Sequence, residues 1–183
     1  TIMEATGLSR IPKLDGQSFL PLLFDKQQKD RDYAYATYYQ IFARIRYPMR
    51  CVQNEGFCYI YNFWADHETA MTGDSTGGLT WRAMIEAAKT DPEISDRVEL
   101  YQYRVPEEFY DCKEDPDGLN NLADNPAYAR ELEKFRNKML EMMKQYDDPA
   151  YEAYRDRHKP GVLGAFMEAQ RQKAKNTKPV ERF

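Results

Sequence analysis

Four short segments of the chain are predicted to be β-strands, and alternating side chains mark the first and the last of them. These segments span residues 33–39, 46–53, 57–62 and 107–112. The second and third are joined at Asn54-Glu55-Gly56, which suits a hairpin turn. In the last segment Glu107 and Glu108 are adjacent, so we expect their side chains on opposite faces and not as a facing carboxylate pair.

Residues 126–146 carry apolar side chains three and four positions apart, the spacing of an amphipathic helix. Asn125 as the N-cap and Pro126 at the first helical position mark its start. The residues Asp147 and Asp148 mark its end, and Asp148 with Glu152 is interpreted as a solvated pair of helix residues. The apolar stripe consists of Tyr128, Leu132, Phe135, Met139, Met142 and Tyr146.

Further helices are predicted over 79–89, from Pro92 onward and over 162–173, and the last ten residues are expected to be disordered. Residues 1–7 have the pattern of the back half of a helix ended by Gly7, so we expect the chain to come from a longer one. Together the elements predict an α+β fold, in which a four-stranded antiparallel sheet is covered by a long C-terminal amphipathic helix.

Composition narrows the range of partners. Among 183 residues, 42% are hydrophobic and 31% are charged, which is typical of an ordinary soluble domain. No apolar run is long enough to cross a bilayer, and a net charge of −4 does not indicate nucleic acid. We therefore expect no membrane and no nucleic-acid partner. The basic stretch 155–182 is interpreted as a solvated helix face and tail, with a polyanion-binding arm as the alternative.

Residues suited to catalysis or metal binding are few. The three cysteines, Cys51, Cys58 and Cys112, have no metal-like spacing, and only His67 and His158 add imidazoles, so no metal site is predicted. Cys51 and Cys58 flank the hairpin turn and can face the same side, but the sequence does not show whether they pair. No G-x-S-x-G, P-loop or H-E-x-x-H motif occurs. We therefore predict no catalytic residue in this chain.

Three segments, in order along the chain, resemble sulfatases of the alkaline-phosphatase-like superfamily. Residues 1–23 are similar to a "D-I-x-P-T … D-G-x-S-x-x-P-L-L" passage. Residues 47–53 and 59–62 resemble the "Y-P-M-R-x-V-x" and "Y-x-Y-I-x-N" runs of the heparan N-sulfatase (N-sulfoglucosamine sulfohydrolase) branch. Residues 104–128 resemble the "E-x-Y-D-x-x-x-D-P-x-x-x-x-N-L-A" run that enters the last long helix of sulfatases. The resemblance covers roughly residues 1–150.

This resemblance implies the C-terminal, non-catalytic part of a sulfatase, which helps to close the substrate pocket. Residues 1–30 would be the end of the catalytic domain and a linker, 31–150 the C-terminal α+β domain, and 151–183 a helical extension and flexible tail. The parent enzyme would hydrolyse sulfate esters or the N-sulfate of a sulfated sugar. The alternative is a stand-alone α+β module that binds a partner or has a structural role, without enzymatic activity.

The resemblance also implies cofactors and partners. Calcium and formylglycine are expected in the missing catalytic domain and none in this chain, because no cysteine here lies in the C/S-x-P-S/A-x-R motif. The expected partners are the catalytic domain of the same polypeptide and a sulfated saccharide, in a periplasmic or secreted protein. Arg50 and Gln53 are the predicted substrate-binding residues, since a guanidinium suits a sulfate or carboxylate and Gln53 suits sugar hydroxyls. The alternative for Arg50 is a pair with an acidic residue at the domain boundary.

Overall fold

The protein folds around one four-stranded antiparallel sheet in the order β1-β2-β3-β4. The computed structural model describes residues 1–9, 11–12, 14, 16–29, 31–39 and 45–176. The strands are β1 (Ala34–Tyr38), β2 (Met49–Gln53), β3 (Phe57–Asn62) and β4 (Glu107–Asp111). The predicted α+β sheet is thus confirmed. Strand β2 begins three residues later than predicted, after Pro48, which has no N–H to give to a sheet.

Six α-helices of the described part accompany the sheet: α1 (Ile2–Ala5), α2 (Leu79–Ala87), α3 (Pro92–Tyr103), α4 (Ala129–Gln145), α5 (Tyr151–Arg155) and α6 (Val162–Asn176). Asn125 acts as the predicted cap, since its Oδ1 accepts a hydrogen bond of 3.0 Å from the Ala127 N–H. The first turn, Pro126–Tyr128, is a 3-10 turn and α4 follows it. The predicted disorder of the last ten residues is wrong for 174–176, which belong to α6, and residues 177–183 lie outside the described part.

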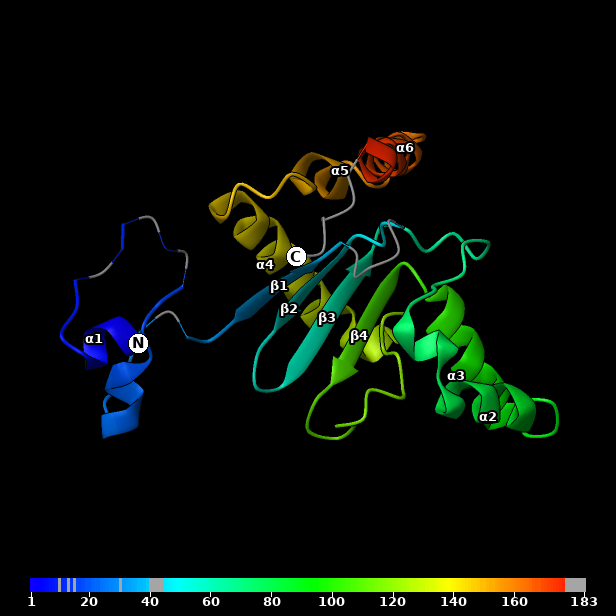
Figure 1. Ribbon diagram of the computed structural model, residues 1–183, viewed down its shortest axis with the longest axis horizontal. Helices are drawn as coiled ribbons and strands as arrows, with labels where there is room; N and C mark the ends of the chain where they lie inside the picture. Colours follow the sequence, from blue (N-terminus) through cyan, green and yellow to red (C-terminus); the bar gives the residue numbers. More distant parts are fainter. Residues whose placement is uncertain (10, 13, 15, 30, 40–44, 177–183) are drawn as a thin grey trace, which may run out of the picture.

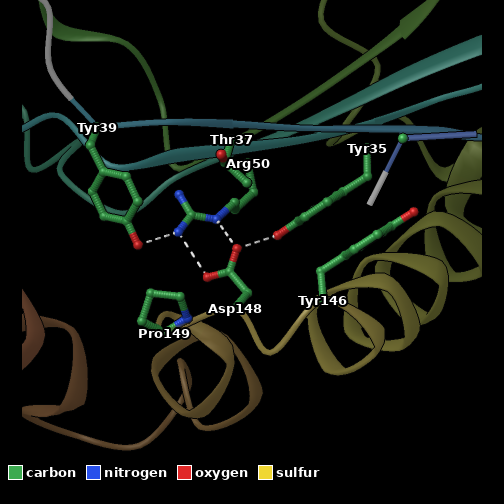
Figure 2. A pocket seen from close by; sticks show the side chains of 8 residues that line it. Tyr35, Thr37, Tyr39, Arg50, Tyr146, Asp148 and Pro149 are labelled. Atoms are coloured by element: carbon green, nitrogen blue, oxygen red, sulfur yellow. Dashed lines mark hydrogen bonds and ion pairs between the residues drawn. The ribbon is translucent and has the colours of Figure 1, made fainter. Parts of the chain in front are cut away.

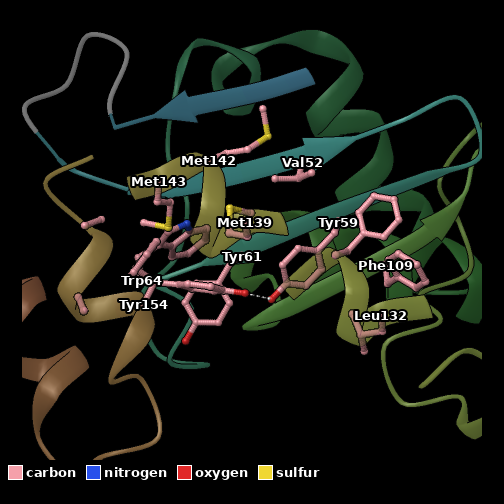
Figure 3. Packing of buried hydrophobic residues seen from close by; sticks show 14 of the residues in the cluster. Val52, Tyr59, Tyr61, Trp64, Phe109, Leu132, Met139, Met142, Met143 and Tyr154 are labelled. Atoms are coloured by element: carbon pink, nitrogen blue, oxygen red, sulfur yellow. Dashed lines mark hydrogen bonds between the residues drawn. The ribbon is translucent and has the colours of Figure 1, made fainter. Parts of the chain in front are cut away.

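Helix α4 lies across one face of the sheet, and α5 and α6 continue that layer (Figure 1). The face of the sheet contributes Val52, Tyr59 and Phe109, whose side chains are fully buried. Within the predicted stripe of α4, the buried residues are Leu132, Phe135, Met139 and Met142 (Figure 3). Tyr154 of α5 and Met167 of α6 join the same core. Burying such side chains stabilises the fold by about 1.5–3 kcal/mol each, so this layer is the main source of stability.

Adjacent glutamates of β4 serve opposite faces, as predicted. Glu107 points toward α4, where it accepts hydrogen bonds from Tyr59 Oη at 2.6 Å and from Arg136 Nε at 3.0 Å. Glu108 points away from α4 and is fully buried. Its partners are Asn62, Arg104 and Tyr110.

The described residues among the first 24 lie to one side of the sheet, whereas α2 and α3 lie beyond β4 on the other side (Figure 1). Of the 13 exposed large hydrophobic residues in the described part, eight fall within residues 1–24. They are Ile2, Leu8, Ile11, Leu14, Phe19, Leu22, Leu23 and Phe24. The rest of the described chain keeps most of its large apolar side chains covered. No helix in the described residues has the length and apolar character needed to span a bilayer.

Candidate functional site

A pocket with a volume of about 490 Å³ opens where β1 and β2 meet the end of α4 (Figure 2). Strands β1 and β2 supply its floor, and the link between α4 and α5 supplies its opposite wall. The lining residues are Gly16, Tyr35, Thr37, Tyr39, Arg50, Tyr146, Asp148 and Pro149. This pocket contains Arg50, the residue for which the sequence predicted substrate binding.

Arg50 is fully buried on the α4 side of β2, and its guanidinium is paired with Asp148. Its Nε donates to Asp148 Oδ2 at 2.6 Å, and its Nη2 donates to Asp148 Oδ1 at 2.8 Å. The remaining hydrogens go to Tyr39 Oη at 2.5 Å and to the carbonyls of Met49 at 2.8 Å and Tyr38 at 3.4 Å. A guanidinium has five N–H donors, and all five are used. The structure thus contains the pair with an acidic residue that the alternative interpretation of Arg50 expected, whereas the domain boundary of that interpretation stays a prediction.

Asp148 is brought into the pocket by the way α4 ends. Asp147 adopts a left-handed conformation with φ of 48°, and the Asp148 N–H donates back to the Met143 carbonyl at 2.8 Å. This is the Schellman arrangement, with aspartate where glycine is usual. Asp148 Oδ1 also accepts from the Ala150 N–H at 2.8 Å and so helps to start α5.

The interpretation of Asp148 as a solvated helix residue is wrong. Only 8% of its surface is exposed, and its ionic partner Arg50 lies 98 positions away in the sequence. Glu152 follows Asp148 by four positions, but the two are not neighbours on one helix, because Asp148 lies in the link between α4 and α5.

The electrostatics of the pocket keep both members of the ion pair charged. Burial by itself would raise the pKa of Asp148, but hydrogen bonds from Arg50, Tyr35 and the Ala150 N–H outweigh it and lower the pKa below its ordinary value. Tyr35 Oη donates to Asp148 Oδ2 at 2.6 Å. Burial, and then the hydrogen bond to Asp148, raise the pKa of Tyr35 far above its ordinary value. Tyr35 therefore stays protonated and acts as a donor.

Aromatic faces form the rim of the pocket. The rings of Tyr35 and Tyr146 are parallel, with centroids 5.7 Å apart and an interplanar angle of 1°. The Arg50 guanidinium lies 4.5 Å from the centroid of the Tyr39 ring. Tyr146 remains 40% exposed at the outer edge. The rim therefore presents flat apolar ring faces beside hydroxyl groups.

Gln53 lies on the other side of the sheet. Side chains alternate along a strand, so two residues three positions apart point in opposite directions. Gln53 is exposed at the end of β2, and its Nε2 lies 3.9 Å from Cys112 Sγ. The structure therefore does not bring Arg50 and Gln53 together. Substrate binding by each remains a prediction, and it would involve two separate surfaces.

The described residues do not fit a metal or formylglycine centre. They contain no group of three or more His, Cys, Asp or Glu side chains arranged to hold a metal ion. His67 is exposed in a loop. None of the three cysteines is followed by the x-P-x-x-R part of the sulfatase nucleophile motif.

Comparison with known proteins identifies the relatives of this chain. No family model matches it. An ulvan-active sulfatase of Formosa agariphila is 31% identical over 152 residues, covering 81% of this chain and 28% of that protein. The N-sulphoglucosamine sulphohydrolase of Homo sapiens is 25% identical over 149 residues, covering 80% of this chain and 28% of that protein.

Solved structures agree in fold. A 2-O GAG sulfatase superposes with a TM-score of 0.54 and 19% identity, covering 84% of this chain and 25% of that one. A protein in complex with its substrate D-glucosamine-2-N,6-O-disulfate superposes with a TM-score of 0.53 and 22% identity, covering 81% and 23%. The chain is therefore an α+β domain homologous to sulfatases over about four fifths of its length. It spans about a quarter of the length of the curated relatives it matches.

Proposed function

We propose that this chain is the non-catalytic, C-terminal part of a sulfatase that hydrolyses the sulfate esters or N-sulfate of a sulfated sugar. One observation carries the proposal: the match to a sulfatase extends over 81% of this chain but over only 28% of the relative. The relatives are an ulvan-active sulfatase and an N-sulphoglucosamine sulphohydrolase, and both ulvan and N-sulphoglucosamine are saccharides. The order of the three sulfatase-like segments supports the C-terminal position.

In this proposal the catalytic domain of the same polypeptide is the partner of the chain. That domain would supply formylglycine and a calcium ion, which acts as a Lewis acid toward the sulfate oxygens. The concentration of exposed apolar side chains in residues 1–24 supports such a partner, because contiguous apolar surface usually marks an interaction site. In the proposed division into residues 1–30, 31–150 and 151–183, this segment is the end of the catalytic domain and the linker, so its apolar side chains would pack on the rest of that domain.

The pocket around Arg50 is proposed to close one side of the substrate site. Because all five guanidinium donors of Arg50 are occupied, its proposed role is to hold Tyr39 and Asp148 in position. Direct binding of a sulfate by Arg50 would require one of these partners to leave. The exposed ring of Tyr146 is the part of the wall available to a sugar ring. Gln53 would contact hydroxyl groups only on the opposite surface of the sheet.

The test begins with the reading frame that encodes the chain. An upstream C/S-x-P-S/A-x-R motif is expected, and protein made from that frame should release sulfate from sulfated saccharides, whereas the present chain alone should not. Tyr146→Ala in the longer protein should raise KM several-fold with an unchanged melting temperature. Leu119→Ala is the matched control, because its side chain is 42% exposed and lies outside the pocket. Sulfate release by the chain alone, or a frame without the motif, would refute the proposal.

A stand-alone binding module is the second candidate. The observation in its favour is the continuous core that the sheet shares with α4, α5 and α6, since it shows a self-contained packing unit. Saturable binding of a sulfated oligosaccharide to the chain, together with a start codon directly before Thr1, would favour this module over the enzyme.

A further inference from the structure

Two thiols meet on the face of the sheet opposite α4. Cys51 of β2 and Cys58 of β3 are both half-buried and reduced, and their Sγ atoms lie 3.5 Å apart. In the strand register Cys51 is opposite Ile60 and Cys58 is opposite Gln53. The two cysteines are therefore diagonal neighbours across one strand pair, which is within reach of side-chain contact.

We propose that Cys51 and Cys58 form a reversible disulfide by exchange with a small-molecule disulfide such as oxidised glutathione. The sulfur atoms must approach from 3.5 Å to about 2.05 Å, which is a movement of about 1.5 Å. Rotation of the two side chains supplies part of this movement, and a small shift of the strand backbones supplies the rest. Cys112, on the same face, contacts Gln53, and its thiol is not part of the close pair.

The environments of the two thiols differ. The hydrogen bond with Cys58 lowers the pKa of Cys51, against the effect of burial. The hydrogen bond with Cys51, followed by burial, raises the pKa of Cys58. A thiolate is the nucleophile in exchange, and the 3.5 Å contact allows either thiol to attack and the other to resolve; attack by Cys51 gives the following steps.

The reaction has two balanced steps. The Cys51 thiolate attacks one sulfur of oxidised glutathione, which breaks the glutathione S–S bond, forms a mixed disulfide and releases one glutathione thiolate. Cys58 then loses its proton to water and attacks the Cys51 sulfur, which forms the Cys51–Cys58 bond and releases the second glutathione thiolate. Two protein thiols are oxidised, and one glutathione disulfide is reduced to two thiols.

The disulfide would covalently join the two strands beside the pocket. Arg50 directly precedes Cys51, and its side chain leaves β2 on the opposite face. Oxidation therefore fixes the strand that carries the buried ion pair. This inference does not depend on the proposed sulfatase role, because it concerns only contacts within the chain.

Tryptic mapping tests the bond directly. The folded chain is incubated with oxidised glutathione, remaining thiols are alkylated, and the chain is digested with trypsin. Cys51 and Cys58 share the peptide 51–82, whereas Cys112 is in the peptide 105–113. We expect peptide 51–82 to carry no alkyl group and to be lighter by two hydrogen atoms than its reduced form, while Cys112 is alkylated.

Single variants define the outcome. Cys112→Ser should keep the internal bond, whereas Cys51→Ser and Cys58→Ser should lose it and retain bound glutathione on the remaining cysteine. Circular dichroism checks that each variant is folded. If a variant is unfolded, the tryptic mapping of the unmodified chain alone decides whether the Cys51–Cys58 bond forms. A bond between peptides 51–82 and 105–113, or stable glutathione adducts without an internal bond in the unmodified chain, would overturn the proposal.

Discussion

Removing the carboxylate of Asp148 is the most direct test of how the pocket is held together. Asp148→Ala leaves the buried Arg50 without an ionic partner and removes the acceptor of the Tyr35 hydroxyl. It also removes the side-chain cap on the Ala150 N–H. We expect the variant to be strongly destabilised, because a buried charge is then left uncompensated.

The magnitude follows from the burial of the pair. The side chains of Arg50 and Asp148 are 0% and 3% exposed, so water cannot replace the lost carboxylate without a rearrangement. Breaking a buried ion pair from one side costs about 3–5 kcal/mol. With a urea dependence of about 2 kcal/mol per molar, this moves the unfolding midpoint down by about 2 M.

Equilibrium urea unfolding followed by circular dichroism measures the loss. Glu141→Ala is the control, because it removes an exposed partner of Lys138 and should change stability by less than about 1 kcal/mol. Replacing both partners at once, with Arg50→Met and Asp148→Leu, should recover part of the loss, since no charge is then left unpaired. If Asp148→Ala is no more destabilising than Glu141→Ala, the reasoning about the buried pair is wrong. By the same argument Arg50→Ala should also destabilise the fold, because it leaves the buried carboxylate of Asp148 without its ionic partner.

Three further outcomes are expected. Phe135→Ala should lower the free energy of unfolding by about 3–5 kcal/mol, because the Phe135 side chain is fully buried between α4 and the sheet. Lys134→Ala, on the exposed side of the same helix, should have little effect. Burial alone would raise the pKa values of Asp148 and Glu107, but their arginine partners lower both below the ordinary values. The two carboxylates therefore stabilise the fold above about pH 4.5, where they are also ionised in the unfolded chain. This stability is lost as the pH falls through their lower pKa values in the folded protein. Asp147→Gly should stabilise the chain by about 1 kcal/mol, because glycine adopts the left-handed conformation without strain.

Each of these outcomes has a contrary result. Equal melting temperatures for Phe135→Ala and Lys134→Ala would show that the α4 stripe is not core. The free energy of unfolding of Asp148→Asn should fall less steeply between pH 5 and 3 than that of the unmodified chain. An equally steep fall would show that Asp148 does not contribute to the loss of stability in acid. A loss of stability in Asp147→Gly, measured by urea unfolding, would mean that the aspartate side chain makes a stabilising contact.

Much of the fold could be predicted because it depends on patterns among residues that are close in the sequence. The strand patterns and the stripe of α4 each depend on residues a few positions apart, and the stripe of α4 is buried where the pattern indicates, at Leu132, Phe135, Met139 and Met142. The Asn54 turn is equally local, since Asn54 Oδ1 accepts from the Gly56 and Phe57 N–H groups. The predicted start of β2 was wrong because the strand-like residues 46–48 include Pro48, which has no N–H to give to the sheet.

The candidate site was harder to predict because its contacts are long-range. Tyr35 and Asp148 are 113 positions apart, and only the folded chain brings them to 2.6 Å. One wall of the pocket could be predicted from the sequence. Alternation along the strand places Tyr35, Thr37 and Tyr39 on a single face, and this face lines the pocket. The same rule separates Arg50 from Gln53, since an odd spacing on a strand reverses the side-chain direction.

The adjacent carboxylates of β4 have a consequence for strand alignment. If β4 slid by one position against β3, Glu108 would enter the apolar layer under α4, and Phe109 would move to the opposite face, among the polar groups that now surround Glu108. Arg136 and Arg104, which approach the sheet from opposite sides, would each lose the acidic partner that now meets them. Mispaired versions of this sheet are thus penalised both by the loss of apolar packing under α4 and by charges without partners, which favours a single register during folding.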